Sequence, residues 1–149
     1  MRYYIDCEFD GHNGPLLSMA IVREDGDSLY IETTEPARDP WVVEHVMPLM
    51  GKHEADTAIQ IPSTFVGRKL AAFIGTDPYA MIVADSPVDI ARFCTAISTA
   101  PGGGYNPCIL PKLSFEVHDV DCYPTTVPGA VQHNAWWDAK ALRELLAPA

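Results

Sequence analysis

Two carboxylates near the start of the chain, Asp6 and Glu8, are the first residues whose types and spacing could do chemistry. They lie in an apolar run, residues 3–9, that is typical of a β-strand. Residues two apart on a strand point to the same face, so both carboxylates should face one way while Cys7 faces the other. Like charges so placed repel each other unless a cation lies between them. The pattern indicates a metal site, with an ordinary solvent-exposed strand face as the alternative.

A second acidic stretch follows a later apolar run, residues 79–84, which is short enough for a buried strand. Asp89 falls in the first turn of the helix predicted after this run, from about residue 87 to 99. An acid in that turn is also favoured by the helix dipole, which is the alternative to a role in a site. Asp85 could cap the helix or could be the ligand in place of Asp89.

The third motif joins His133 and Asp138, which are five positions apart near the end of the chain. Residues at this spacing on one helix diverge by about 140°. The two side chains can therefore converge only if His133 lies on the loop that leads into a helix containing Asp138. Asn134 is a good helix cap, so a capped helix with an unrelated histidine is the alternative.

The elements that would position these residues follow from hydrophobic periodicity and turn signals. Strands are predicted at residues 3–9, 16–23 and 28–33, and the short connections between them favour antiparallel pairing. Further strands are predicted at residues 79–84 and 113–118, with helices at about 41–49, 63–74, 87–99 and 136–146. This order predicts an α/β fold in which parallel strands extend three antiparallel ones and helices flank the mixed sheet. Such an arrangement is similar to the ribonuclease H-like fold.

Length and composition predict one globular unit. The 149 residues are 48% hydrophobic, which suffices for one core, so we expect a single domain over residues 1–149. No run of about 20 apolar residues is present, and Asp6 interrupts the start, where a secretion signal would be apolar. We therefore expect a cytoplasmic protein with no membrane partner.

Cysteine usage and charge narrow the function further. The four cysteines include no Cys-x-x-Cys pair, which favours reduced thiols over a zinc site. The net charge of -10 argues against a protein that holds long nucleic acid mainly through a basic face. A nucleic-acid enzyme is still compatible with this charge, because metal ions held by converging carboxylates reverse the local sign.

Taken in order, the three motifs resemble those of the DEDDh (DnaQ-like) 3′-5′ exonuclease family. The resemblance extends from Asp6 to Asp138. Residues 6–9 with 16–22, and residues 41–49, also look like the short single-domain bacterial 3′-5′ exoribonucleases within that family. Val88 departs from the family, where an aromatic residue usually precedes the second aspartate, and Asp85 stands where many members have asparagine.

The resemblance implies a two-metal site and a general base. It implies that two divalent ions, Mg²⁺ or Mn²⁺, are held by Asp6, Glu8, Asp89 and Asp138, with Asp6 shared between them and Asp89 preferred to Asp85. It implies that His133 accepts the proton of the attacking water. Phe9 and Leu16 or Leu17 are expected to contact the terminal bases. The expected substrates are single-stranded RNA, which we favour, or DNA, cut from the 3′ end to nucleoside 5′-monophosphates.

Other functions remain open at the level of the sequence. The same fold could carry an endonuclease, a DNA-directed or proofreading exonuclease, or a module that binds nucleic acid or protein without catalysis. The turn that contains Gly11, His12 and Asn13 could touch a terminal ribose, or it could be a plain turn. A homodimer is compatible with the sequence, which names neither the oligomeric state nor the contact that distinguishes RNA from DNA.

Overall fold

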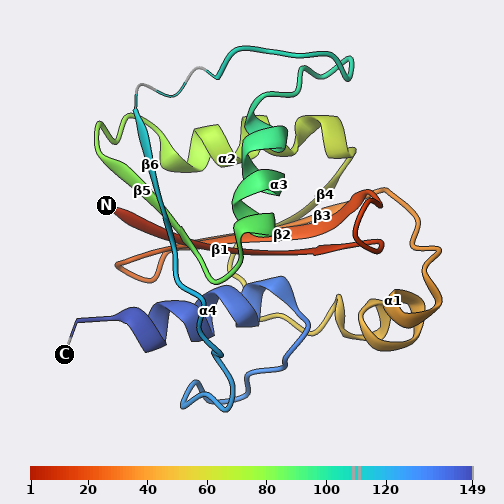
Figure 1. Ribbon diagram of the computed structural model, residues 1–149, viewed down its shortest axis with the longest axis vertical. Helices are drawn as coiled ribbons and strands as arrows, with labels where there is room; N and C mark the ends of the chain where they lie inside the picture. Colours follow the sequence, from red (N-terminus) through yellow and green to blue (C-terminus); the bar gives the residue numbers. More distant parts are fainter. Residues whose placement is uncertain (109, 111, 149) are drawn as a thin grey trace.

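The computed structural model describes residues 1–108, 110 and 112–148. Within these residues, a six-stranded sheet with the order β4-β3-β2-β1-β5-β6 forms the centre of the molecule (Figure 1). The strands are β1 (Arg2–Phe9), β2 (Leu16–Arg23), β3 (Ser28–Thr33), β4 (Ala58–Ile61), β5 (Ala80–Ala84) and β6 (Leu113–Val117). β1, β2 and β3 pair antiparallel, whereas β4 joins β3, β5 joins β1 and β6 joins β5 in parallel. The predicted α/β, ribonuclease H-like arrangement is confirmed.

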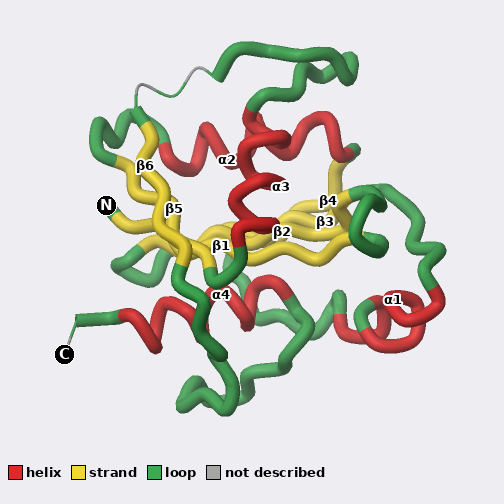
Figure 2. Tube along the Cα trace, viewed as in Figure 1, coloured by secondary structure: helices red, strands yellow, loops and turns green. Residues whose placement is uncertain are grey.

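Helices cover both faces of the sheet. They are α1 (Pro40–His45), α2 (Val66–Ile74), α3 (Pro87–Ile97) and α4 (Ala135–Leu146). Figure 2 shows α2 and α3 on one side of the sheet and α4 on the other, with α1 beyond one end of it. The helices α2 and α3 pack closely at Gly67 of α2. A Cβ at this position would lie 2.0 Å from the carbonyl oxygen of Ala96 in α3, so only glycine fits there. Among the residues described, no helix is both long and apolar enough to cross a membrane.

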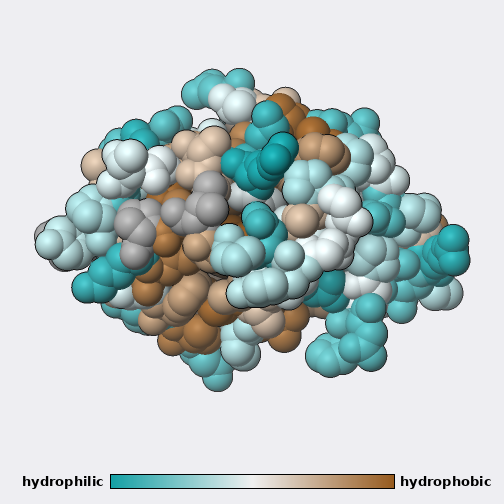
Figure 3. All heavy atoms as spheres, turned by 90° about the horizontal axis from the view of Figure 1, so that it is seen from above, coloured by the Kyte–Doolittle hydropathy of each residue, from teal (hydrophilic) through white to brown (hydrophobic). Residues whose placement is uncertain are grey.

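Strand alternation divides the core between the two faces. Ile5 and Cys7 of β1 pack in the cluster that contains Leu70 of α2 and Phe93 of α3. Tyr4 packs instead with Leu142 of α4. Asp6 and Glu8 continue the alternation of Tyr4, so they lie on the α4 side of β1. The side of the molecule seen from above in Figure 3 carries hydrophobic residues gathered over one part of its surface and hydrophilic residues over much of the rest.

Polar caps start the helices that border the site. Asp39 accepts hydrogen bonds from the backbone N–H groups of Trp41 and Val42 at the start of α1. Ser86 accepts one from Val88 at the start of α3, so serine and not Asp85 is the cap there. At α4, the cap is Asn134. Each cap satisfies backbone donors that a helix start otherwise leaves without partners.

Three features differ from the sequence prediction. Periodicity did not predict β4, since this strand has only four residues and two of them are exposed. The helix expected over residues 41–49 is split into α1 and a 3₁₀ turn, Met47–Leu49, where proline occupies the first turn. Likewise, the helix expected from residue 63 begins as a 3₁₀ turn, Ser63–Phe65, and becomes α-helical at Val66.

Candidate functional site

Carboxylates from four elements meet near the carboxyl end of β1. Asp6 and Glu8 come from β1 itself, Asp85 follows β5, and Asp89 and Asp138 lie in the first turns of α3 and α4. β1 and β5 are parallel neighbours, so their carboxyl ends lie at the same edge of the sheet, where α/β folds commonly place sites. The structure therefore brings together the predicted carboxylates and adds Asp85 to them.

Among the described residues these carboxylates form two groups, each able to offer three oxygens that all lie within 4.8 Å of one another. One group is Asp6, Glu8 and Asp138, and the other is Asp6, Asp85 and Asp89. Asp6 belongs to both. A set of carboxylate oxygens with this spacing fits Mg²⁺ or Mn²⁺ better than a soft metal.

The electrostatics of the cluster favour a cation. Burial, followed by repulsion from Asp89, Asp138, Glu8 and Asp85, raises the pKa of Asp6 well above its usual range. Burial is also the largest cause at Glu8, whose pKa rises to about 8. The pKa values of Asp138 and Asp89 rise to about 7 and about 6, mainly through burial. Without a cation these groups resist ionisation, so the donor set fits a divalent metal ion.

Asp89 is the most enclosed of these carboxylates, with a relative exposure of 3%. The thiol of Cys7, which faces the α2–α3 side as expected, donates a hydrogen bond of 2.8 Å to Asp89 Oδ1. Asp85 is only partly buried, and its pKa is raised by that burial. Asp85 and Asp89 both lie in the cluster, so each could contribute an oxygen to the same metal position.

His133 lies on the loop before α4, as its spacing from Asp138 required. Its backbone N–H donates a hydrogen bond of 3.0 Å to Asp138 Oδ2, and it adopts a positive φ of 65°. The imidazole packs edge-on against Trp41, with 5.5 Å between ring centroids. Trp41 also stacks on His45 at 4.9 Å, so His133 contacts α1 through its ring and Asp138 through its backbone N–H.

An open hollow of about 430 Å³ reaches the carboxylate cluster at Glu8. Its lining includes Glu8 and Phe9 of β1, Gly11 and His12 of the following turn, and Trp41 of α1. The turn that could touch a ribose therefore borders the site. Trp41 is 52% exposed, which leaves much of its surface free for contact.

The structure separates the three predicted base-contacting residues. Phe9 lines the hollow beside the carboxylates, but Leu17 is 1% exposed and packs with Val42, Val46 and Met50. The pairing register shifts at Glu8/Phe9, so that Phe9 pairs with Leu16 and Leu17 is the extra residue. A bulge of this kind redirects the side chains beyond it. Leu17 consequently supports α1 and offers no surface to a base in this structure.

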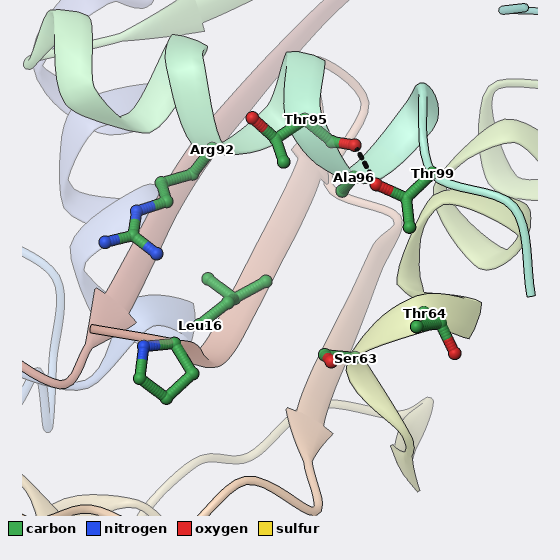
Figure 4. Close-up of a pocket in the computed structure, with 8 residues that line it drawn as sticks. Leu16, Ser63, Thr64, Arg92, Thr95, Ala96 and Thr99 are labelled. Carbon is green, nitrogen blue, oxygen red and sulfur yellow. Dashed lines mark hydrogen bonds between the residues drawn. The ribbon is translucent and has the colours of Figure 1, made fainter. Parts of the chain in front are cut away.

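Leu16 lines a second, smaller hollow of about 180 Å³ between α3, the start of β2 and the 3₁₀ turn before α2 (Figure 4). Arg92 of α3 borders this hollow and donates hydrogen bonds to the carbonyl oxygens of Gly14 and His12, at 2.6 and 3.0 Å. Its guanidinium also lies 4.6 Å from the centroid of the Phe9 ring. Arg92 therefore ties α3 to the turn between β1 and β2.

Two residues at the site were not predicted, and both lie on the loop between β6 and α4. The hydroxyl of Tyr123 donates a hydrogen bond of 2.7 Å to Asp138 Oδ1. The Cys122 thiol lies 3.7 Å from Asp85 Oδ2, and burial raises its pKa to about 12. Periodicity carries no signal in such a loop, so only the three-dimensional contacts reveal these residues. The exposed Trp41 was predicted as part of the helix over residues 41–49 and of the segment that resembles the bacterial exoribonucleases, without a role of its own at the site.

Comparison with known proteins gives a partial match. No protein-family model matches the chain. Two curated proteins named 3′-5′ exoribonuclease, from the Mycobacterium tuberculosis strains CDC 1551 / Oshkosh and H37Rv, are each 47% identical to it over 53 residues. The match covers 32% of this chain and 32% of each relative, so the chain matches about a third of the length of these curated relatives.

Proposed function

We propose that this protein is a two-metal-dependent 3′-5′ exonuclease that hydrolyses single-stranded nucleic acid, RNA in preference to DNA, to nucleoside 5′-monophosphates. The observation that carries this proposal is the pair of carboxylate groups that share Asp6. The similarity to two proteins named 3′-5′ exoribonuclease supports it, over about a third of the chain. The resemblance of the motifs to the DEDDh family supplies the direction of cutting and the role of the histidine.

Each carboxylate group would hold one divalent ion. Asp6, Glu8 and Asp138 would bind the first ion, and Asp6, Asp85 and Asp89 the second. When bound, such a pair of ions supplies an acidified water for attack and stabilises the charge on the leaving 3′ oxygen. Asp6 would set the spacing between the two positions, because it contributes to both.

His133 would act as the general base. Histidine suits this role because its imidazole titrates close to neutral pH. The hydrogen bond from its backbone N–H to Asp138 holds the residue at the edge of the carboxylate cluster. Trp41 provides a surface against which the ring rests.

Substrate would be held mainly by the ions and by apolar contacts. Phe9 and Trp41 offer aromatic surface in the hollow beside the carboxylates, and stacking of bases on aromatic rings is tolerant of sequence. Leu16 would contribute at the neighbouring hollow. With a net charge of -10, the protein lacks the charge for a long phosphate track. Short single strands should therefore be cut at least as well as long ones, in distributive steps.

A cleavage ladder tests this proposal directly. We expect 5′-labelled single-stranded RNA to be shortened one nucleotide at a time in Mg²⁺ or Mn²⁺, with slower cutting of the matching DNA and of blunt duplexes. A circular single strand should resist, because it has no 3′ end. Cleavage of the circle would indicate an endonuclease instead, and an absence of cleavage with both metals and both nucleic acids would refute the proposal.

A further inference from the structure

The loop between β6 and α4 runs past α4 before the chain turns back to start this helix (Figure 1). The hydroxyl of Tyr123, on this loop, donates a hydrogen bond of 2.7 Å to Asp138 Oδ1. The other oxygen of Asp138 accepts the backbone N–H of His133 at 3.0 Å. The two oxygens of one carboxylate are thus held from two different segments of the chain.

Two hydrogen bonds of this kind fix the plane of a carboxylate. A free aspartate in the first turn of a helix can rotate about its terminal torsion, which has only broad preferences. A donor on each oxygen removes that freedom. An ionised carboxylate has about four lone-pair positions, so positions remain on Asp138 for a metal ion, now with a defined direction.

The structure holds Tyr123 in place independently of Asp138. Its backbone N–H donates to Asp121 Oδ1 at 2.9 Å, and its ring packs against the cluster that contains Tyr4 and Leu142. The adjacent residue, Cys122, is buried and lies beside Asp85. Consecutive residues of one loop therefore contact the two carboxylate groups, Tyr123 through Asp138 and Cys122 through Asp85.

We propose that Tyr123 is a positioning residue that holds Asp138 in the orientation needed to bind a divalent ion. The proposal rests on the proposed function, because it concerns the same metal centre. Partners that orient a ligand typically change metal affinity or activity by about 10- to 100-fold when removed. Tyr123 acts on the group of Asp6, Glu8 and Asp138, so the other ion should be affected less.

The test compares Tyr123→Phe with Tyr3→Phe. Both changes delete one hydroxyl that donates to an aspartate, but Tyr3 bonds Asp77 at 3.0 Å, at the opposite end of β1. Mn²⁺ binding is measured by calorimetry on the full chain, and cleavage rates are measured across Mn²⁺ concentrations. We expect Tyr123→Phe to weaken one Mn²⁺ binding event about 10-fold, whereas Tyr3→Phe should bind as the wild type does.

Saturating metal separates positioning from a general loss of structure. Excess Mn²⁺ should restore most of the cleavage rate of Tyr123→Phe, because the carboxylate ligand itself is still present. In an Asp138→Asn background, Tyr123→Phe should cause no further loss of Mn²⁺ affinity. Melting curves without metal show whether either tyrosine variant is unfolded, and Tyr123→Leu, which also removes the hydroxyl donor and keeps an apolar side chain, provides a second variant with the same expected loss of Mn²⁺ affinity if Tyr123→Phe does not fold.

The outcomes distinguish this inference from the proposed function. If wild type and Tyr123→Phe bind Mn²⁺ equally while the wild type cuts RNA, the inference is overturned and the exonuclease stands. If Mn²⁺ binding depends on Tyr123 but the wild type cuts no nucleic acid, the inference is supported and the proposed reaction fails. Equal weakening in Tyr123→Phe and Tyr3→Phe would assign the effect to stability and overturn the inference.

Discussion

Asp6 is the residue on which both carboxylate groups depend. Replacing its charge with a neutral amide should abolish nearly all cleavage, since Asp6→Asn removes a ligand from both proposed ion positions. The same change removes a carboxylate whose pKa is raised by burial and then by repulsion from its carboxylate neighbours. The metal-free variant should therefore melt at a higher temperature than the metal-free wild type.

Melting curves in EDTA and in Mn²⁺, together with cleavage rates, check this prediction. Asp56→Asn is the matched control, because Asp56 is exposed on the loop before β4. We expect the control to keep its activity and its stabilisation by Mn²⁺. Wild-type cleavage by Asp6→Asn would remove Asp6 from the metal centre.

A second prediction at this scale concerns His133. His133→Ala should slow the chemical step by about 10²- to 10⁴-fold, the usual contribution of a positioned base, while Mn²⁺ affinity stays nearly unchanged. The decline of the wild-type rate at acid pH should flatten in the variant, because the group that must be unprotonated is gone. Single-turnover rates between about pH 5.5 and 9 measure both effects.

His45→Ala serves as the control for this experiment, since His45 also contacts Trp41 but approaches it from within α1. It should keep the acid decline and most of the rate. An identical acid decline in His133→Ala and the wild type would exclude His133 as the base.

At the scale of elements, the start of α3 determines how two aspartates divide their roles. Ser86 caps the helix, which leaves Asp85 on the connection from β5 and places Asp89 in the first turn of the helix. Asp89 is enclosed and accepts the Cys7 thiol, so it has little freedom to move aside or to be replaced by water. Asp85 is more exposed, and a water molecule could substitute for it.

We therefore expect Asp89→Ala to abolish cleavage and Asp85→Ala to lower it by about 10- to 100-fold, the range typical of supporting groups around a metal. Steady-state rates at several Mn²⁺ concentrations distinguish the two variants, because added metal should partly rescue Asp85→Ala alone. The opposite ranking would make Asp85 the principal ligand.

At the scale of the whole molecule, the buried carboxylate cluster should make the stability of the metal-free protein depend on pH. The pKa values of Glu8 and Asp138 rise to about 8 and about 7, chiefly through burial. Folded carboxyl groups with raised pKa values bind more protons than the unfolded chain does, so the metal-free fold loses stability as the pH rises. The loss should begin near the ordinary carboxyl pKa, at about pH 4, and continue to about pH 8.

Thermal melts in EDTA from about pH 4.5 to 8.5 test this expectation. Mn²⁺ should stabilise the protein most at the alkaline end, where the cluster carries the most charge and bound cations relieve it. Asp6→Asn should show a shallower decline in EDTA. A metal-free melting temperature that rises steadily with pH would contradict the electrostatic description of the site.

Local rules were enough to predict much of the fold and the candidate ligands from the sequence. Alternation along β1 placed Asp6 and Glu8 on one face, because strand geometry repeats every two residues. The predicted cap at Asn134 lies at the start of α4, whereas α3 is capped by Ser86 and not by Asp85, which the sequence had offered. The placement of His133 before α4 followed from helix geometry, since five residues on one helix would not bring it to Asp138.

Tertiary structure alone decided the rest. The bulge opposite Glu8 and Phe9 turned Leu17 toward α1, and a single inserted residue of this kind leaves no periodic signal. β4 forms because β3 offers it a parallel edge, although its four residues have no strong pattern of their own. Tyr123 reaches Asp138 across 15 positions of sequence. Such contacts depend on where the sheet brings distant segments together, which residue types and spacing do not encode locally.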